Sequence, residues 1–179
     1  MQFRQVSSIF LGLLYSVSGT PLGQIVESRQ LLPTIAVNLN FTHITGHFTP
    51  LSAITNTLNV DFDISPIIPL DVLDRLVTIS ITNMTLSAGI FGTEYISFTH
   101  AFDTPLAVPL SGSVNSGTIS GVSLTQGALA TVLNALPAHT LDIFSAGVNM
   151  EVTLITRPFT SPLFLPLTQS NVDTTWSLI

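Results

Sequence analysis

The sequence predicts a mainly β domain, either a sandwich or a barrel, with about seven to nine short strands. Apolar and polar residues alternate along most of the chain, turn signals separate these runs, and helical spacing occurs once. Hydrophobic residues make up 46% of the 179 residues but charged residues only 8%, so Ser, Thr and Asn must supply the polar face. The length fits one domain.

The first two strands are predicted from period-two alternation. In "TIAVNLNFTHITGHF" (34–48) one parity carries the apolar side chains, which are Ile35, Val37, Leu39 and Phe41. In "TLNVDFDIS" the inward set is Leu58, Val60, Phe62 and Ile64. These runs predict two half-buried strands with their Asn and Asp residues facing solvent.

A strand, a turn and a strand are predicted over residues 77–102. "VTISITNMTL" changes phase at Thr82–Asn83, which predicts a β-bulge. Gly89 and Gly92 supply the turn. The returning strand "YISFTHAF" then carries its inward set, which is Ile96, Phe98, His100 and Phe102.

One helix is predicted near 125–136. Its apolar positions lie at i, i+3, i+4 and i+7, and are Leu129, Val132, Leu133 and Leu136. Thr125 is the expected N-cap and Pro137 the stop. We expect the four apolar side chains to pack against the sheet.

The C-terminal third returns to strand patterns. "TLDIFSAGVNMEVTLI" alternates again through its apolar positions, which are Val148, Met150, Val152 and Leu154. "SNVDTTWSLI" is predicted as the last strand. Between them, "PFTSPLFLPL" is an apolar segment punctuated by proline. If it were exposed, it would form an apolar interaction patch.

Residues 1–19 predict a secretory signal peptide. Arg4 supplies a positive charge, an apolar stretch follows, and small residues near Gly19 suit cleavage. The stretch is shorter than the roughly 20 apolar residues of a membrane-spanning helix. The alternative is a membrane anchor formed by residues 6–18.

The expected mature chain begins near Thr20, with a linker at 20–33 and the β domain at 34–179. We expect it to be secreted and extracellular. Asn40 in "NFT" and Asn83 in "NMT" are the expected glycosylation sites. Alternation turns Asn40 outward, and the bulge turns Asn83 out of the core.

Several stretches together resemble an uncharacterised fungal family that is similar to the group 2 late embryogenesis abundant (water-stress) domain. They are "LNVDFDISPIIPLDVL", the 77–102 hairpin, "GVSLTQGALATVLNAL" and "LPLTQSNVDTTWSLI". The resemblance covers roughly residues 34–179. It implies a single antiparallel β-sandwich of fibronectin-III-like type with a helix between late strands. It implies no catalytic residues, and members are often membrane-anchored.

Histidines offer one candidate for chemistry. His43 and His47 are four residues apart, which suits one metal ion on a helix. On a strand they are about 13 Å apart, which is too far for a shared metal. We therefore interpret them as ordinary rim histidines, and His100 as a hydrogen-bonded core residue.

Carboxylates offer a second candidate. Asp61 and Asp63 share a strand face at about 6.6 Å along the strand. With Asp71 or Asp74 they could bind calcium, or the pair could serve a glycosidase. The sequence has no EF-hand loop and one Trp, so a solvated face is the preferred interpretation. No metal or cofactor is expected.

The expected function is a non-catalytic extracellular interaction or structural role at the cell surface, in the wall or under stress. The alternative is binding of a lipid or small apolar ligand, and a hydrolase without a recognisable motif is third. No G-x-S-x-G, P-loop or G-x-G-x-x-G occurs. Four scattered Arg and a net charge of −6 disfavour nucleic acid. The partner could be a protein, a polysaccharide or a lipid, with membrane association left open.

Overall fold

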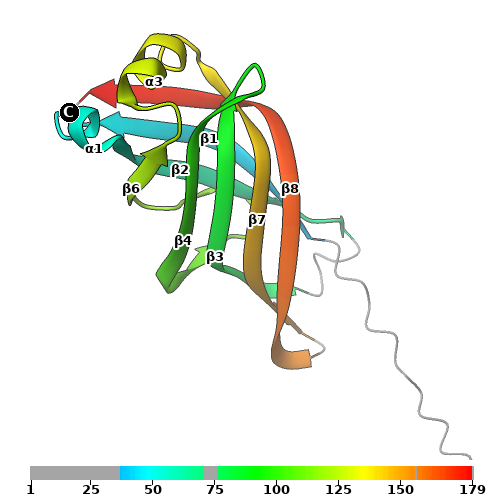
Figure 1. Cartoon of the computed structure of the whole chain (residues 1–179). Coiled ribbons are helices and arrows are strands. Elements are labelled where there is room, and N and C mark those ends of the chain that lie inside the picture. Colours follow the sequence, from blue (N-terminus) through cyan, green and yellow to red (C-terminus); the bar gives the residue numbers. More distant parts are fainter. Residues whose placement is uncertain (1–36, 71–75, 156, 179) are drawn as a thin grey trace, which may run out of the picture. The chain divides into compact units, whose positions relative to one another are not determined.

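A computed structural model describes residues 37–70, 76–155 and 157–178, within the compact unit Thr34–Ile179. Its strands share one sheet (Figure 1) and are β1 (Asn38–Phe48), β2 (Thr57–Ile67), β3 (Leu76–Ile90), β4 (Thr93–Val108), β5 (Val114–Asn115), β6 (Ile119–Leu124), β7 (Thr140–Leu154) and β8 (Arg157–Leu178). Two short helices lie between strands of this sheet. They are α1 (Ser52–Thr55), between β1 and β2, and α3 (Ala128–Asn134), between β6 and β7.

The sheet closes on itself. The hydrogen-bonded order is β1-β8-β7-β3-β4-β6-β2, and β2 pairs again with β1, while β5 adds to β2. In the described part of the chain this makes a barrel of seven strands. The mainly β prediction is confirmed, but the antiparallel sandwich is not what the pairing gives. Strand β1 bonds to strands on both sides, and its pairing with β8 is parallel.

Strand β2 follows the predicted parity, with Leu58, Val60, Phe62 and Ile64 all buried. Strand β1 begins with the predicted parity and then changes phase. Its register with β2 shifts between Phe41 and His43, and Ile44 and Phe48 become the inward residues.

The predicted bulge in β3 is confirmed. The register shifts between Ile81 and Asn83 against both β4 and β7, and the residues on either side, Ile81 and Met84, are fully buried. The Asn83 side chain is half-buried, and its Oδ1 accepts a hydrogen bond from Asn149 Nδ2 at 2.6 Å. Asn40 is also half-buried. Glycosylation at Asn40 and Asn83 stays a prediction.

The β3–β4 turn is tighter than predicted. Phe91 and Gly92 form it, with φ of 51° and 78°. Positive φ at both central residues is typical of a type I′ turn, where Asn and Gly are usual. Gly89 lies inside β3, where an added Cβ would be 1.9 Å from the Thr93 carbonyl oxygen. The turn therefore presents a phenylalanine that is 98% exposed.

Helix α3 exists where a helix was predicted, and its predicted buried face is confirmed in part. Val132 and Leu136 are half-buried and pack against the core, whereas Leu129 and Leu133 are 73% and 65% exposed. The fully buried side chains of the helix are the smaller Ala128 and Thr131. The buried face is therefore rotated away from Leu129 and Leu133.

Thr125 is not the N-cap. Its hydroxyl donates to the Glu94 carbonyl instead.

The segment "PFTSPLFLPL" belongs to strand β8. Of its described side chains, Leu163, Leu165 and Leu167 pack against the core, and Phe164 points to solvent. Pairing with β1 is confined to residues 174–178. The earlier part of β8 pairs with β7 and accommodates its prolines as an edge strand does.

The predicted signal peptide (1–19), the linker (20–33), Asp71 and Asp74 lie outside the described residues. Among the residues described, no helix has the length and apolar character needed to cross a membrane.

Candidate functional site: an apolar pocket at the helical end

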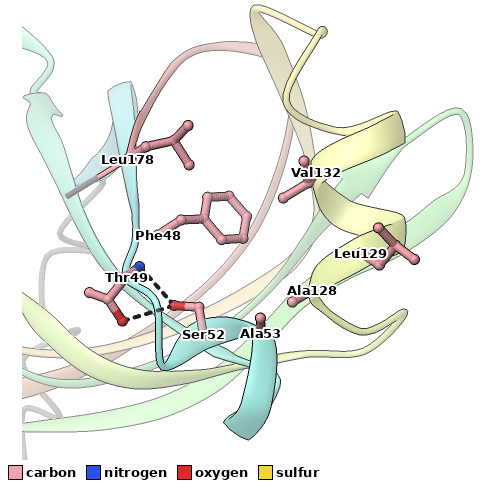
Figure 2. Close-up of a pocket in the computed structure, with 8 residues that line it drawn as sticks. All are labelled: Phe48, Thr49, Ser52, Ala53, Ala128, Leu129, Val132 and Leu178. Atoms are coloured by element: carbon pink, nitrogen blue, oxygen red, sulfur yellow. Dashed lines mark hydrogen bonds between the residues drawn. The ribbon is translucent and has the colours of Figure 1, made fainter.

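A pocket of about 280 Å³ lies where α1 and α3 meet the ends of β1 and β8 (Figure 2). Its lining is mostly apolar and consists of Phe48, Thr49, Ser52, Ala53, Ala128, Leu129, Val132 and Leu178. Figure 2 shows the Phe48 ring directed toward Val132, with Ala53 and Ala128 on the two facing helices. Small side chains on the two helices leave room between them.

Asn56 fixes the two helices relative to each other. It ends α1 in the left-handed conformation, with φ of 52°, and its N–H donates to the Ser52 carbonyl. Its side-chain Oδ1 accepts a hydrogen bond from the Ala128 N–H at 3.0 Å. One residue therefore closes α1 and caps the first turn of α3.

Phe48 is the aromatic residue in the pocket lining, and Trp176 packs against it. The rings of Phe48 and Trp176 are 5.7 Å apart, and Trp176 Nε1 donates to the Ala138 carbonyl at 3.3 Å. The indole lies over Gly46, where an added Cβ would be 2.4 Å from it. Glycine at position 46 thus lets β8 place its tryptophan beneath the loop that follows α3.

Polar groups at the pocket are few and uncharged. Ser52 Oγ accepts a hydrogen bond from the Thr49 N–H at 3.0 Å and lies 3.3 Å from Thr49 Oγ1. The sequence has no Asp, Glu, Lys or Arg in residues 49–58 and 125–138. The pocket therefore suits an apolar group with at most a hydrogen-bonding end, because a charged ligand would find no counter-charge on these segments.

A second constellation lies on the outer face of the sheet. Ser177 Oγ is 2.6 Å from His47 Nδ1, and His47 Nε2 is 2.7 Å from Asp61 Oδ2. Asn115 Nδ2 donates to Asp61 Oδ1 at 3.0 Å and to Asp63 Oδ1 at 2.8 Å. These side chains, which we call the polar chain, connect β8, β1, β2 and β5.

The protonation pattern of the polar chain follows from Asp61. Partial burial alone would raise the pKa of Asp61, but hydrogen bonds from Asn115 and His47 and the charge of His47 together lower it. An ionised carboxylate only accepts hydrogen bonds, so His47 Nε2 carries a proton and donates to Asp61 Oδ2. In the tautomer with its proton on Nε2, His47 Nδ1 accepts a hydrogen bond from the Ser177 hydroxyl. Serine hydrolases also connect a serine, a histidine and an aspartate, but there Nε2 faces the serine and Nδ1 faces the aspartate.

The structure brings together only some of the candidate residues that the sequence analysis named. Asp61 and Asp63 share a face, whereas both ring nitrogens of His47 form hydrogen bonds, one with Ser177 and one with Asp61. Within the described ranges, no group of three or more His, Cys, Asp or Glu side chains could hold a metal ion. His100 is half-buried, and its ring meets Phe102 edge-on at 4.7 Å.

Sequence reasoning missed the residues that build both constellations. Asn56, Ser177 and Asn115 are polar residues whose partners lie far away in the chain. A usable signal existed for Asn56 alone, since an asparagine after a short apolar turn suits a left-handed helix end. For the other two, only the strand order reveals the partner.

Comparison of the sequence with protein-family models and with curated proteins gave no match.

Proposed function

We propose that this protein is a non-catalytic binding protein that holds a small apolar ligand, or the apolar end of a larger lipid, in the pocket between α1 and α3. The observation that carries the proposal is the apolar pocket itself, with Phe48 in its lining and uncharged helices on either side. Pockets of this composition are the usual form of small-molecule sites.

The pocket volume limits the size of the ligand. An enclosed cavity of about 150 Å³ holds benzene, and ligand pockets span about 300–1,000 Å³. A pocket of about 280 Å³ therefore suits one substituted ring or a short alkyl segment. A full-length lipid would bury only one end, with Thr49 and Ser52 available to hydrogen-bond a hydroxyl or ester group.

The wider setting that we propose is extracellular. It rests on the signal-like residues 1–19, the two sequons at Asn40 and Asn83, and the resemblance to the fungal family similar to the water-stress domain. In that setting the protein would serve at the cell surface or in the wall without catalysis. Protein or polysaccharide partners at other surfaces are compatible with this function.

The test is binding of a fluorescent monoacylglycerol analogue, which is uncharged, to the full-length protein. Ala53 lines the pocket and is exposed, so Ala53→Phe should fill the site without disturbing the core. Ala101→Phe, on exposed β4, is the matched control. We expect affinity to fall about tenfold or more in the first variant and to be unchanged in the second. Equal affinity in all three proteins would contradict the proposal.

A second candidate is ester hydrolysis at Ser177, favoured by the serine–histidine–aspartate connection. We rank it second because the same bonds have a structural role: His47 and Ser177 are register partners that hold β1 to β8. The test is turnover of p-nitrophenyl acetate by the protein and by Ser177→Ala. Turnover that survives in Ser177→Ala, or no turnover at all, would remove this candidate.

A further inference from the structure

Large apolar side chains on the elements that form the pocket point to solvent. Leu51 just before α1 and Ile54 within it are 65% and 78% exposed, and Leu129 and Leu133 on α3 are 73% and 65% exposed. Leu178, at the end of β8, is 76% exposed. We call these five residues the apolar rim. Exposed apolar groups gathered at one end of a molecule are typical of interaction sites.

The β3–β4 turn adds a second, independent feature. Phe91 is 98% exposed and has a positive φ of 51°, which is costly for a bulky residue. Asn would satisfy the same turn without that cost. Figure 1 shows this turn at the same end of the barrel as α3. An exposed aromatic in a strained turn thus accompanies the apolar rim.

The charge distribution identifies the occupant as a neutral lipid surface. Anionic membranes attract clusters of Lys and Arg, and residues 49–58 and 125–138 contain neither. A net charge of −6 adds long-range repulsion from such membranes. Protein interfaces combine aromatic, Met and Arg residues with a polar margin. The apolar rim consists of Leu and Ile only, which matches the acyl boundary of a bilayer better.

The apolar rim is also continuous with the pocket. Leu129 and Leu178 belong to both, as Figure 2 shows for the pocket side. If the apolar rim lay at the acyl boundary, the pocket mouth would open toward the lipid chains. An apolar ligand could then enter without crossing water.

We propose that the apolar rim inserts into the surface of a neutral phospholipid bilayer and that the pocket takes its ligand from there. The loading step rests on the proposed function, whereas the docking step does not. Docking through apolar side chains without cations should be insensitive to salt.

The test is co-sedimentation of the full-length protein with vesicles of phosphatidylcholine alone, and of equal parts phosphatidylcholine and phosphatidylserine. The test variant is Leu129→Ser with Leu133→Ser. Its matched control is Ile67→Ser with Leu70→Ser, since those residues are 54% and 82% exposed near the end of β2. Both variants keep the same N-terminal segment, so any difference between them reports the apolar rim.

We expect the partition coefficient on phosphatidylcholine to fall about tenfold or more in the rim variant and to be unchanged in the control. Phosphatidylserine should not strengthen binding. Equal binding of the two variants would overturn the proposal. So would a wild-type dimer in sedimentation velocity that only the rim variant dissociates, because a second copy would then be the occupant.

The two proposals fail separately. Ala53→Phe should abolish probe binding but keep vesicle binding. Vesicle binding without any probe binding would leave docking intact and remove the ligand pocket. Probe binding without vesicle binding would remove docking and leave the pocket.

Discussion

Strand β2 and helix α3 both carry a regular apolar repeat, yet β2 buries its whole set of large side chains and α3 leaves part of its set in solvent. Strand β2 buries its large residues, including Phe62 and Ile64. Helix α3 buries Ala128 and Thr131 and exposes Leu129 and Leu133. A strand in a closed barrel has one inner face, whereas a helix across the barrel end can rotate about its axis.

The difference separates stability from binding. In the barrel wall, large apolar side chains leave water and stabilise the fold. At the helical end, Ala128 and Thr131 are buried and Val132 and Leu136 are half-buried, whereas Leu129 and Leu133 remain exposed. The following predictions test this division.

The largest effect is expected in the wall. Phe62 is 1% exposed, and its ring lies 5.5 Å from that of Phe41. Phe62→Ala should lower the free energy of unfolding by about 3–5 kcal/mol, because the cavity cannot fully collapse. Urea denaturation measures it. Phe91→Ala is the control, with a change within about 0.5 kcal/mol. Similar losses of unfolding free energy in the two variants would contradict the stabilising role of the barrel wall.

Asn56 should have the next largest effect, because it joins α1 to α3. Asn56→Ala removes the acceptor for the Ala128 N–H and puts alanine at a positive φ, a conformation that asparagine tolerates better, at a cost of about 2 kcal/mol. Asn56→Gly keeps the backbone freedom and should cost about half as much. Thermal unfolding of both variants measures this. A glycine variant less stable than the alanine variant would contradict the left-handed role.

The polar chain should contribute less, and in a pH-dependent way. The folded-state pKa of Asp61 lies below its ordinary value of 3.8, so its stabilisation is present above that value. The contribution disappears as pH falls through the folded-state pKa. Asp61→Asn should therefore cost less than about 1 kcal/mol at neutral pH. Melting curves at several pH values check this. If the stability lost in Asp61→Asn increased at acidic pH, the lowered pKa of Asp61 would be contradicted.

The smallest effect is expected at the apolar rim. Leu133→Ala should change the free energy of unfolding by no more than about 0.5 kcal/mol, because the side chain is 65% exposed. Chemical denaturation measures it. A loss of about 2 kcal/mol or more would mean that Leu133 packs against the barrel after all.

The sequence predicted features that depend on strand parity. Because a half-buried strand has a period of two, the sequence predicted the inward residues of β2 and of the end of β7. A change in that period predicted the bulge at Asn83. The mainly β class followed from the same alternation. The position of the helix followed from apolar residues at i, i+3, i+4 and i+7.

The remaining features depend on tertiary placement. In residues 128–136 the apolar positions are wide enough apart for more than one buried face, and only packing places Val132 and Leu136 against the core and Leu129 and Leu133 in solvent. Barrel closure depends on β1 bonding to both β2 and β8, which no local pattern encodes. The pocket and the polar chain both arise at that closure, so neither was predicted.

Closure through β1 and β8 also sets an order of events during synthesis. His47 and Ser177 are 130 residues apart in the chain but hydrogen-bonded partners in the barrel. At about 5–20 residues per second, the ribosome needs roughly 6–26 s to deliver the second after the first. During that interval β1 has one unpaired edge, a template for pairing with another chain. A nascent chain that stops before residue 174 keeps that edge open.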